Sequence, residues 1–418
     1  MIEEKLHPFK LPDNFKLGTA TSSLQIEGGD VNNSWYIWSE KNHIKDNSHC
    51  IRACEHWNRI DEDIKLINGL NSKYYRMSIE WARIEPSQGV YNHDALKHYY
   101  DEIKKLKQNN IEPLVTLHHF SNPIWLENKG GWLNGDVVRC FEEYVEFVVE
   151  NLIDLVQSWV TINEPNVYLV LGYIIGDWPP GEKYSLSKFN RCAKNMIMAH
   201  KRAYEKIHDI GQKKGTEICV GVAHHLRVMH PKNNNFLDRF ITKRIKENFN
   251  DFFVKSMVSD FLGINYYTRD MVGFTFNPLK KFVSIDFKTE SMKNDLGWEI
   301  YPGGLYEVCR EYYKKNKLPI FITENGVCDN NDRLRVRFIY DHLLEVKKLI
   351  DEGVDVRGYY HWSLMDNFEW SEGVSARFGL YHVDFVNQKR TIKQSGKFYA
   401  KLCKHNGITE DMINRFLI

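Results

Sequence analysis

The sequence predicts an α/β fold, a single (β/α)8 TIM barrel that spans residues 1–418. Short apolar runs rich in β-branched and aromatic residues recur along the chain. Segments with the periodicity of amphipathic helices separate most of these runs. The chain has no low-complexity linker and no break in composition. Strands that alternate with helices pair in parallel through right-handed crossovers, and eight such units close into a barrel.

The apolar runs and the helical patterns place the elements in order. Strands are expected at 15–21, 74–79, 113–119, 159–163, 218–223, 260–267, 320–324 and 356–362. Helices are expected at 61–70, 94–109, 137–149, 190–210 and 334–351. The helix at 94–109 has Leu96, Tyr99 and Ile103 at helical spacing. Residues 265–296 are strand-like where a helix would continue the pattern, so we expect a loop excursion with a small hairpin there.

Two of the predicted strands end on a glutamate. The stretch Pro-Ile-Phe-Ile-Thr-Glu-Asn-Gly ends its apolar run at Glu324, and Ser-Trp-Val-Thr-Ile-Asn-Glu-Pro ends at Glu164. Carboxyl ends of barrel strands meet on one rim, so the two glutamates should form one site. Such a pair suits cleavage of a glycosidic bond, because one carboxylate supports the oxocarbenium-like centre and the other carboxyl protonates the leaving oxygen. Two close like charges raise one pKa, which keeps one glutamate protonated near neutral pH.

Further polar and aromatic residues fall at the same ends of the strands. They are Gln25, Arg76, His119, Asn163, Asn265, Tyr267 and Trp362. Any one of them could be a hydrogen-bonded structural residue, but together they favour an active site. Arg76 and Tyr267 are placed to keep one glutamate ionised as a nucleophile.

On these motifs the sequence resembles family 1 glycoside hydrolases, the β-glucosidase and β-galactosidase family, over essentially its whole length. Thr-Ile-Asn-Glu-Pro resembles the family's acid/base segment, which implies that role for Glu164. Ile-Thr-Glu-Asn-Gly resembles the nucleophile segment, which implies covalent attack by Glu324. The resemblance therefore implies a retaining β-glycosidase without a cofactor or a metal, acting on terminal β-linked sugars.

The resemblance also implies a sugar-binding set. Gln25 and His119 match residues that bind the sugar, Asn163 would hold its 2-hydroxyl, and Trp362 would form a stacking platform. Glu369 and Trp370 would hold the 4- and 6-hydroxyls, and Trp298 resembles a residue that borders the leaving-group site; Asn265 joins the set through its place at a strand end. The family's 6-phospho-β-glycosidases carry Ser at the position of Glu369. A carboxylate there would repel a phosphate dianion, so unphosphorylated substrates are favoured.

Two positions depart from the family pattern. Phe120 stands where the family usually has Trp, which removes an indole N–H that could reach the 3-hydroxyl. Glu80 stands where many members have a small residue, and we expect a surface ion pair there. Between glucose, galactose and fucose the sequence makes no choice, and the oligomeric state is open.

Several alternatives stay open. A 6-phospho-β-glycosidase, a transglycosylase or a non-catalytic sugar-binding barrel could share this scaffold. A metal site is conceivable in the cluster at 49–56, and the pairs His118-His119 and His224-His225 could suggest ligands. Neighbouring residues in a strand point to opposite faces, however, so only one histidine of each pair can face the barrel mouth.

Bulk composition limits the partners. The net charge is +1 and there is no basic stripe, so nucleic acid is not expected as a partner. No apolar run is long enough for a membrane span, and the first 16 residues do not resemble a signal peptide. The eight cysteines are scattered, which is typical of a reduced, cytoplasmic protein. A small carbohydrate is the expected partner.

Overall fold

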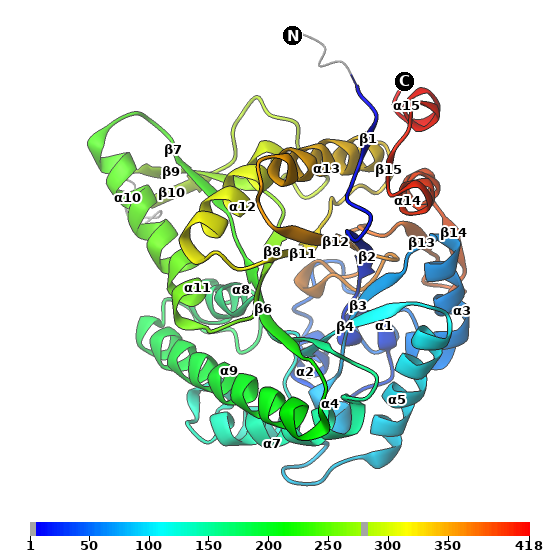
Figure 1. Ribbon diagram of the computed structural model, residues 1–418. Coiled ribbons are helices and arrows are strands. Elements are labelled where there is room, and N and C mark those ends of the chain that lie inside the picture. Colours follow the sequence, from blue (N-terminus) through cyan, green and yellow to red (C-terminus); the bar gives the residue numbers. More distant parts are fainter. Residues whose placement is uncertain (1–5, 277–282) are drawn as a thin grey trace.

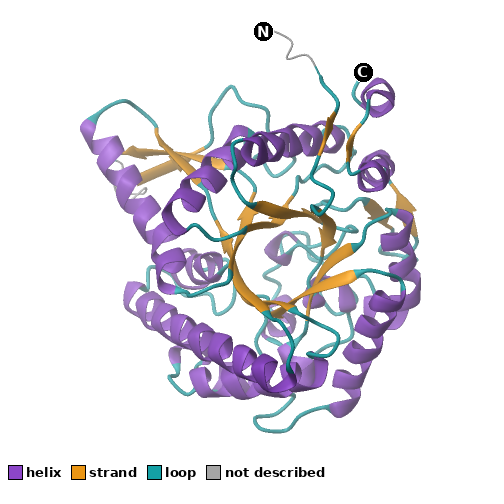
Figure 2. Cartoon of the chain, in the orientation of Figure 1, coloured by secondary structure: helices purple, strands orange, loops and turns teal. Residues whose placement is uncertain are grey.

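The computed structural model describes residues 6–276 and 283–418, and its centre is a closed barrel of eight parallel strands (Figures 1 and 2). This confirms the predicted fold class. The strands run around the barrel in chain order and the last pairs with the first: β2 (Lys16–Ala20), β3 (Tyr74–Ser78), β4 (Glu112–His118), β5 (Ser158–Asn163), β6 (Cys219–His225), β8 (Phe261–Tyr266), β11 (Ile320–Asn325) and β12 (Val356–Trp362).

Helices surround the barrel (Figure 2). The longer ones are α3 (His56–Gly69), α5 (His93–Gln108), α7 (Val137–Leu152), α9 (Leu186–Lys214), α10 (Phe236–Lys246), α12 (Gly303–Asn316), α13 (Arg335–Asp351) and α14 (Gln394–His405). The shorter ones are α1 (Ser23–Glu27), α2 (Ser34–Glu40), α4 (Trp81–Ile84), α6 (Ile124–Asn128), α8 (Pro165–Leu169), α11 (Phe252–Ser256) and α15 (Glu410–Phe416). Single turns are η1 (Gly131–Leu133) and η5 (Trp370–Glu372), and π-helical segments are η2 (Val170–Ile175) and η3 (Glu247–Asp251). All five helices expected from the sequence are present, with shifted ends.

The barrel strands are apolar because both of their faces are covered. All six residues of β11 are buried. Inside the barrel, Leu114, Val160, Phe261 and Phe321 belong to one cluster, while a larger cluster fills the layer under the helices. Gly221 lets the ring of Phe261 lie in the interior, since a Cβ at this position would come within 2.7 Å of the ring. A packed interior fixes the strand ends, and with them the rim.

The expected excursion at 265–296 contains a hairpin, although residues 277–282 lie outside the described part of the chain. Strand β9 (Arg269–Phe274) pairs antiparallel with β10 (Val283–Asp286). A third strand, β7 (Val228–Pro231), pairs with β9 in parallel, and the sequence did not predict it. This sheet and α10 form the lobe at the upper left of Figure 1. Two small antiparallel pairs complete the chain: β1 (Phe9–Lys10) with β15 (Gly407–Ile408), and β13 (Tyr381–Val383) with β14 (Arg390–Ile392).

The expectation of a surface ion pair at Glu80 was wrong. Glu80 is only 3% exposed, and its Oε2 accepts a hydrogen bond of 3.0 Å from Ser23. Burial raises the pKa of Glu80 to about 8, and the neighbouring charges of Asp30 and Glu27 add to this shift. Glu80 directly precedes α4, and Ser23, which bonds to it, is the first residue of α1.

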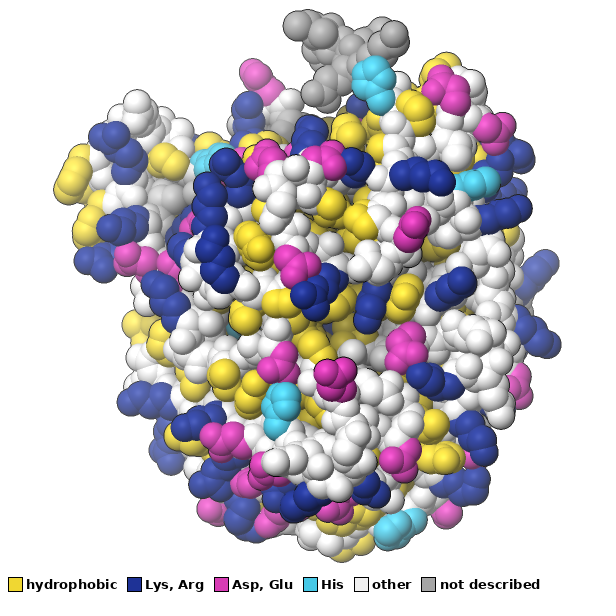
Figure 3. Space-filling model, in the orientation of Figure 1, with side chains coloured by type: hydrophobic (Ala, Val, Ile, Leu, Met, Phe, Trp, Pro, Cys, Tyr) yellow, Lys and Arg dark blue, Asp and Glu magenta, His cyan; other side chains and the backbone are white. Residues whose placement is uncertain are grey.

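The exterior carries mixed charge. On the face shown in Figure 3, basic and acidic side chains are interspersed and do not gather into a patch of one sign. Within residues 6–276 and 283–418, no helix is both long enough and apolar enough to cross a membrane.

Candidate active site

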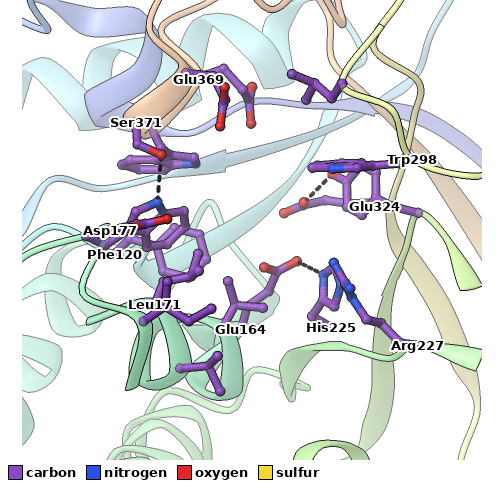
Figure 4. Close-up of a pocket in the computed structure, with 18 of the residues that line it drawn as sticks. Phe120, Glu164, Leu171, Asp177, His225, Arg227, Trp298, Glu324, Glu369 and Ser371 are labelled. Atoms are coloured by element: carbon purple, nitrogen blue, oxygen red, sulfur yellow. Dashed lines mark hydrogen bonds and ion pairs between the residues drawn. The ribbon is translucent and has the colours of Figure 1, made fainter. Parts of the chain in front are cut away.

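A cavity of about 490 Å³ opens at the carboxyl ends of the barrel strands. Eight of the twelve predicted site residues line it: His119, Glu164, Tyr267, Trp298, Glu324, Trp362, Glu369 and Trp370. The other four, Gln25, Arg76, Asn163 and Asn265, are buried behind this lining and bond to residues in it. The structure therefore brings the whole predicted set together at one cavity, part of whose lining is drawn in Figure 4.

Glu164 stands at the turn between β5 and α8. Its backbone adopts a left-handed conformation, with φ at 42°, which is uncommon for a residue other than glycine and occurs preferentially at functional sites. Pro165 then starts α8, where its fixed φ suits the first helical position. The carboxylate Oε1 accepts hydrogen bonds from Asn265 Nδ2 at 2.7 Å and from His225 Nδ1 at 3.1 Å. No described residue donates to Oε2.

Glu324 is the residue before the end of β11, and two donors hold its carboxylate. Arg76 donates to Oε1 from the barrel interior, and Tyr267 donates to Oε2 at 2.8 Å. Arg76 is fully buried, and its second Nη donates to Asn163 at 2.7 Å. Burial raises the pKa of Glu324 to about 7; the charge of Arg76 opposes this shift and that of Glu164 adds to it. Each carboxylate oxygen of Glu324 therefore has a donor, and the residue lines the cavity.

Glu369 lies across the cavity from Glu164 (Figure 4). Its Oε2 accepts hydrogen bonds from Gln25 Nε2 at 3.3 Å and from Trp362 Nε1 at 3.4 Å. Burial raises the pKa of Glu369 to about 8, and the Trp362 bond opposes this shift. The rings of Trp362 and Trp370 lie parallel to His119, with centroids 6.0 and 5.9 Å from it. These polar edges and aromatic faces can hold a sugar ring.

Two aromatic side chains limit the cavity on its sides. Trp298 packs edge-on against Tyr267, with centroids 6.1 Å apart, on the side of Glu324. Phe120 lies across from it and packs on Trp178 and Trp370 at 4.8 and 5.2 Å. The departure from Trp to Phe at position 120 is therefore in the cavity wall.

Sequence reasoning missed His225, Arg227 and Asp270. His225 ends β6 and bonds to Glu164, Arg227 Nε donates to His225 Nε2 at 3.1 Å, and Asp270 accepts two bonds from Arg227. The expectation that one histidine of each adjacent pair faces the mouth is confirmed by His119 and His225. The position of His225 at a strand end, the same signal that selected Asn163, could have identified it.

The described residues contain no group of three or more His, Cys, Asp or Glu that could hold a metal ion. In the cluster at 49–56, Cys50 and Cys54 are buried thiols. His56 is held by carboxylates, Asp63 at 2.8 Å and Glu102 at 3.0 Å. That histidine belongs to a buried ion-pair network between α3 and α5.

Known proteins share this fold and much of this sequence. The model of glycosyl hydrolase family 1 matches residues 7–259 and 254–408. A β-glucosidase A of Thermotoga maritima is 33% identical, over 96% of this chain and 99% of its own. A β-galactosidase of Sulfolobus acidocaldarius is 29% identical over 96% of each chain. The structure of a β-glycosidase from Pyrococcus horikoshii superposes with a TM-score of 0.92 at 36% identity and 99% coverage of both chains. The chain belongs to glycosyl hydrolase family 1.

Proposed function

We propose that this protein hydrolyses terminal β-glucosides by double displacement and that it favours apolar aglycones. The observation that carries the proposal is the unequal bonding of the two glutamates. Glu324 has a donor on each oxygen, from Arg76 and Tyr267, which suits a charged nucleophile. Glu164 has both donors on Oε1, so Oε2 is open to carry a proton.

The reaction follows from a charged carboxylate at Glu324 and a protonated carboxyl at Glu164. Glu324 attacks the anomeric carbon, the glycosidic bond breaks, and the proton of Glu164 moves to the leaving oxygen. Water then enters, Glu164 takes a proton from it, and the hydroxide oxygen displaces Glu324. Two displacements at one carbon return the original β configuration. Asn163 and Asn265 link Arg76 to Glu164 by hydrogen bonds. Arg76 donates to Asn163, and Asn265 donates to both Asn163 and Glu164, so these side chains are held in fixed positions relative to one another.

We assign the sugar to the end of the cavity that holds Glu369. Glu369 and Gln25 would bind the 4-hydroxyl, and Trp370 would border the 6-hydroxyl. His119 and Asn163 would hold the 3- and 2-hydroxyls over the Trp362 platform. A buried carboxyl at Glu369 suits a free 6-hydroxyl, whereas a 6-phosphate would place a dianion beside it. This supports a glucosidase over a 6-phospho-β-glycosidase.

The aglycone would lie beyond Glu164, where the wall is apolar. Val167 of α8, Val170, Leu171 and Ile175 of η2, and Phe249 of η3 belong to the lining. A sugar in this place would bury hydroxyls against groups that cannot hydrogen-bond to them. Two charged pairs of the lining, Arg227 with Asp270 and Lys45 with Glu372, are already bonded to each other. An aryl or alkyl group therefore suits the wall better than a second sugar.

The test compares β-glycosides that differ either in the sugar or in the aglycone, but not in both. We expect cleavage of p-nitrophenyl β-glucoside, β-galactoside or β-fucoside, and none of the 6-phospho-β-glucoside. Among alkyl β-glucosides, kcat/KM should rise about three- to fourfold per added methylene until the wall is filled. Cellobiose should be cleaved less well than octyl glucoside. Cleavage confined to the phosphorylated substrate would refute the assignment of Glu369, and a preference for cellobiose would refute the apolar aglycone.

Transglycosylation uses the same two glutamates, so the products decide it. With added alcohol as an acceptor, alkyl glucoside should form only as a minor product beside glucose. A predominance of transfer at low alcohol concentration would make the protein a transglycosylase.

We further place the protein in the cytoplasm. All eight cysteines are free, and burial raises the pKa of several of them, Cys50 and Cys192 to about 12. Unpaired, protonated thiols are stable in a reducing compartment. Fractionation of cells that produce the native protein should find it with cytoplasmic markers, and recovery from the medium would contradict this placement.

A further inference from the structure

We infer that His225, Arg227 and Asp270 act as a relay that decides which oxygen of Glu164 carries the catalytic proton. The inference rests on the acid/base role proposed for Glu164. His225 is the last residue of β6, the strand beside β5, and its Nδ1 lies 3.1 Å from Glu164 Oε1 (Figure 4). All three are positioning residues, because none is needed to touch the reacting atoms.

The tautomer of His225 follows from its partner on the other side. Arg227 has donors only, and its Nε donates to His225 Nε2 at 3.1 Å. The Nε2 atom must therefore offer its lone pair, and the ring proton must be on Nδ1. Asp270 is 3% exposed and fixes the guanidinium through two bonds of 2.9 and 3.0 Å to one Nη atom. The sequence of donors thus runs from Arg227 through His225 to Glu164.

This arrangement makes the two oxygens of Glu164 unequal. Oε1 already accepts from His225 and from Asn265, so a proton on Oε1 would face two N–H groups. Oε2 receives no hydrogen bond from a described residue, so the proton belongs there. In the first displacement, the O–H bond at Oε2 breaks, a new O–H bond forms on the leaving oxygen, and the electron pair remains on Glu164. The donors on Oε1 stabilise the charge that appears at this moment.

The ring of His225 is held by packing as well as by hydrogen bonds. Tyr267 lies parallel to it with centroids 5.8 Å apart, and Phe249 meets it edge-on at 6.1 Å. Phenylalanine at position 225 would keep both contacts and lose only the nitrogens. The site therefore permits a substitution that tests the relay separately from the packing.

Other titratable groups also act on Glu164. Glu324 from β11 and Glu369 from the segment after β12 add negative charge, and Tyr267 faces both glutamates. Arg76 is positively charged and bonds to Asn163, the residue before Glu164. None of them donates a hydrogen bond to Glu164, so they do not select the oxygen that carries its proton.

The experiment compares pH profiles and leaving groups in three variants. His225→Phe removes the N–H that donates to Glu164. Arg227→Met removes the donor to His225 Nε2, so that the ring proton of His225 is no longer confined to Nδ1. Arg227→Met is combined with Asp270→Asn so that no buried charge is left unpaired. Arg337→Met is the matched control, because Arg337 also makes two bonds to one carboxylate, that of Asp341, on the exposed face of α13. Each is measured with a dinitrophenyl β-glucoside, which needs little protonation, and with an alkyl β-glucoside, which needs it fully.

For both relay variants we expect kcat on the alkyl glucoside to fall about tenfold or more, with a much smaller loss on the dinitrophenyl glucoside. The basic limb of the kcat/KM profile should move up by about one pH unit, because Glu164 keeps its proton longer when the donor to its charged form is lost. Arg337→Met should match the parent. Equal losses on both substrates, or an unmoved basic limb in either relay variant, would overturn the inference. Activity of the parent on the dinitrophenyl glucoside tests the proposed function separately.

Discussion

Tyr267→Phe offers the most direct measure of how the nucleophile is kept ionised. The hydroxyl donates to Glu324 Oε2 at 2.8 Å, and a hydrogen bond to a charged group contributes about 1.5–3 kcal/mol. One pKa unit corresponds to about 1.4 kcal/mol, so its loss should raise the pKa of Glu324 by about one to two units above its value of about 7. Phenylalanine retains the ring that lies against His225.

The sign of the effect follows from the role of the ionised carboxylate. Activity appears as the pH rises through the pKa of Glu324, so the acid limb of the kcat/KM profile should move to higher pH by the same one to two units. At pH 6, below the pKa in both proteins, this shift alone lowers kcat/KM about ten- to a hundredfold, and the deficit shrinks as the pH rises.

The assay is hydrolysis of p-nitrophenyl β-glucoside across the pH range. Tyr204→Phe is the control, since Tyr204 also donates to a carboxylate, that of Asp260 at 2.5 Å, at the other end of the barrel. Its profile should equal that of the parent. An acid limb in Tyr267→Phe that stays in place, or that moves to lower pH, would refute the reasoning.

Three further predictions use the same structure. Glu324→Ala should abolish turnover, and azide should restore formation of the α-glucosyl azide; a β-azide as the main product would exclude Glu324 as the nucleophile. Glu164→Ala should lower kcat/KM on alkyl glucosides about 10²–10⁴-fold and spare dinitrophenyl glucosides, so equal losses would contradict its role as the acid. Glu80 keeps its proton more tightly in the folded state, with a pKa of about 8 against 4.5, so the protein should lose stability as the pH rises from about 4.5 to about 8. Glu80→Gln should remove up to about 4 kcal/mol of this loss, measured by urea unfolding at pH 5 and pH 8.5, and an unchanged difference between the two pH values would contradict it.

The elements with one clear pattern were predictable from the sequence. Strand β11 is six buried residues after Pro319, and its last residue, Asn325, precedes Gly326, so both the strand and the place of Glu324 at its end follow from local residues. Helix α9 was predicted too short, at 190–210. It extends to Lys214 because polar residues continue the helix after the apolar face ends, and Gly215 stops it in a left-handed conformation with φ at 67°. Periodicity marks the buried face of a helix and not its ends.

The surroundings of charged residues were harder to predict from the sequence, because they depend on segments that are distant in the chain. Glu80 stands between Ile79 and Trp81 at the end of a strand, and a charged residue at such a place is expected to turn to solvent, yet Glu80 is buried and Ser23, 57 residues away, bonds to its carboxyl. Asp270 and Arg227 are separated by 43 residues and meet only because β7 pairs with β9. A pattern within one segment cannot reveal a partner that a second sheet supplies.

The apolar wall of the cavity, in contrast, follows a pattern within one segment. An α-helix places residues three or four apart on one face, which selects Val167, Val170, Leu171 and Ile175 after the acid/base glutamate. Segment η2 is π-helical, yet all four of these side chains line the cavity. The aglycone preference proposed above depends on these four apolar residues, which follow the most recognisable motif of the chain, so the same stretch of sequence that supplies the acid/base glutamate also supplies the wall beside it.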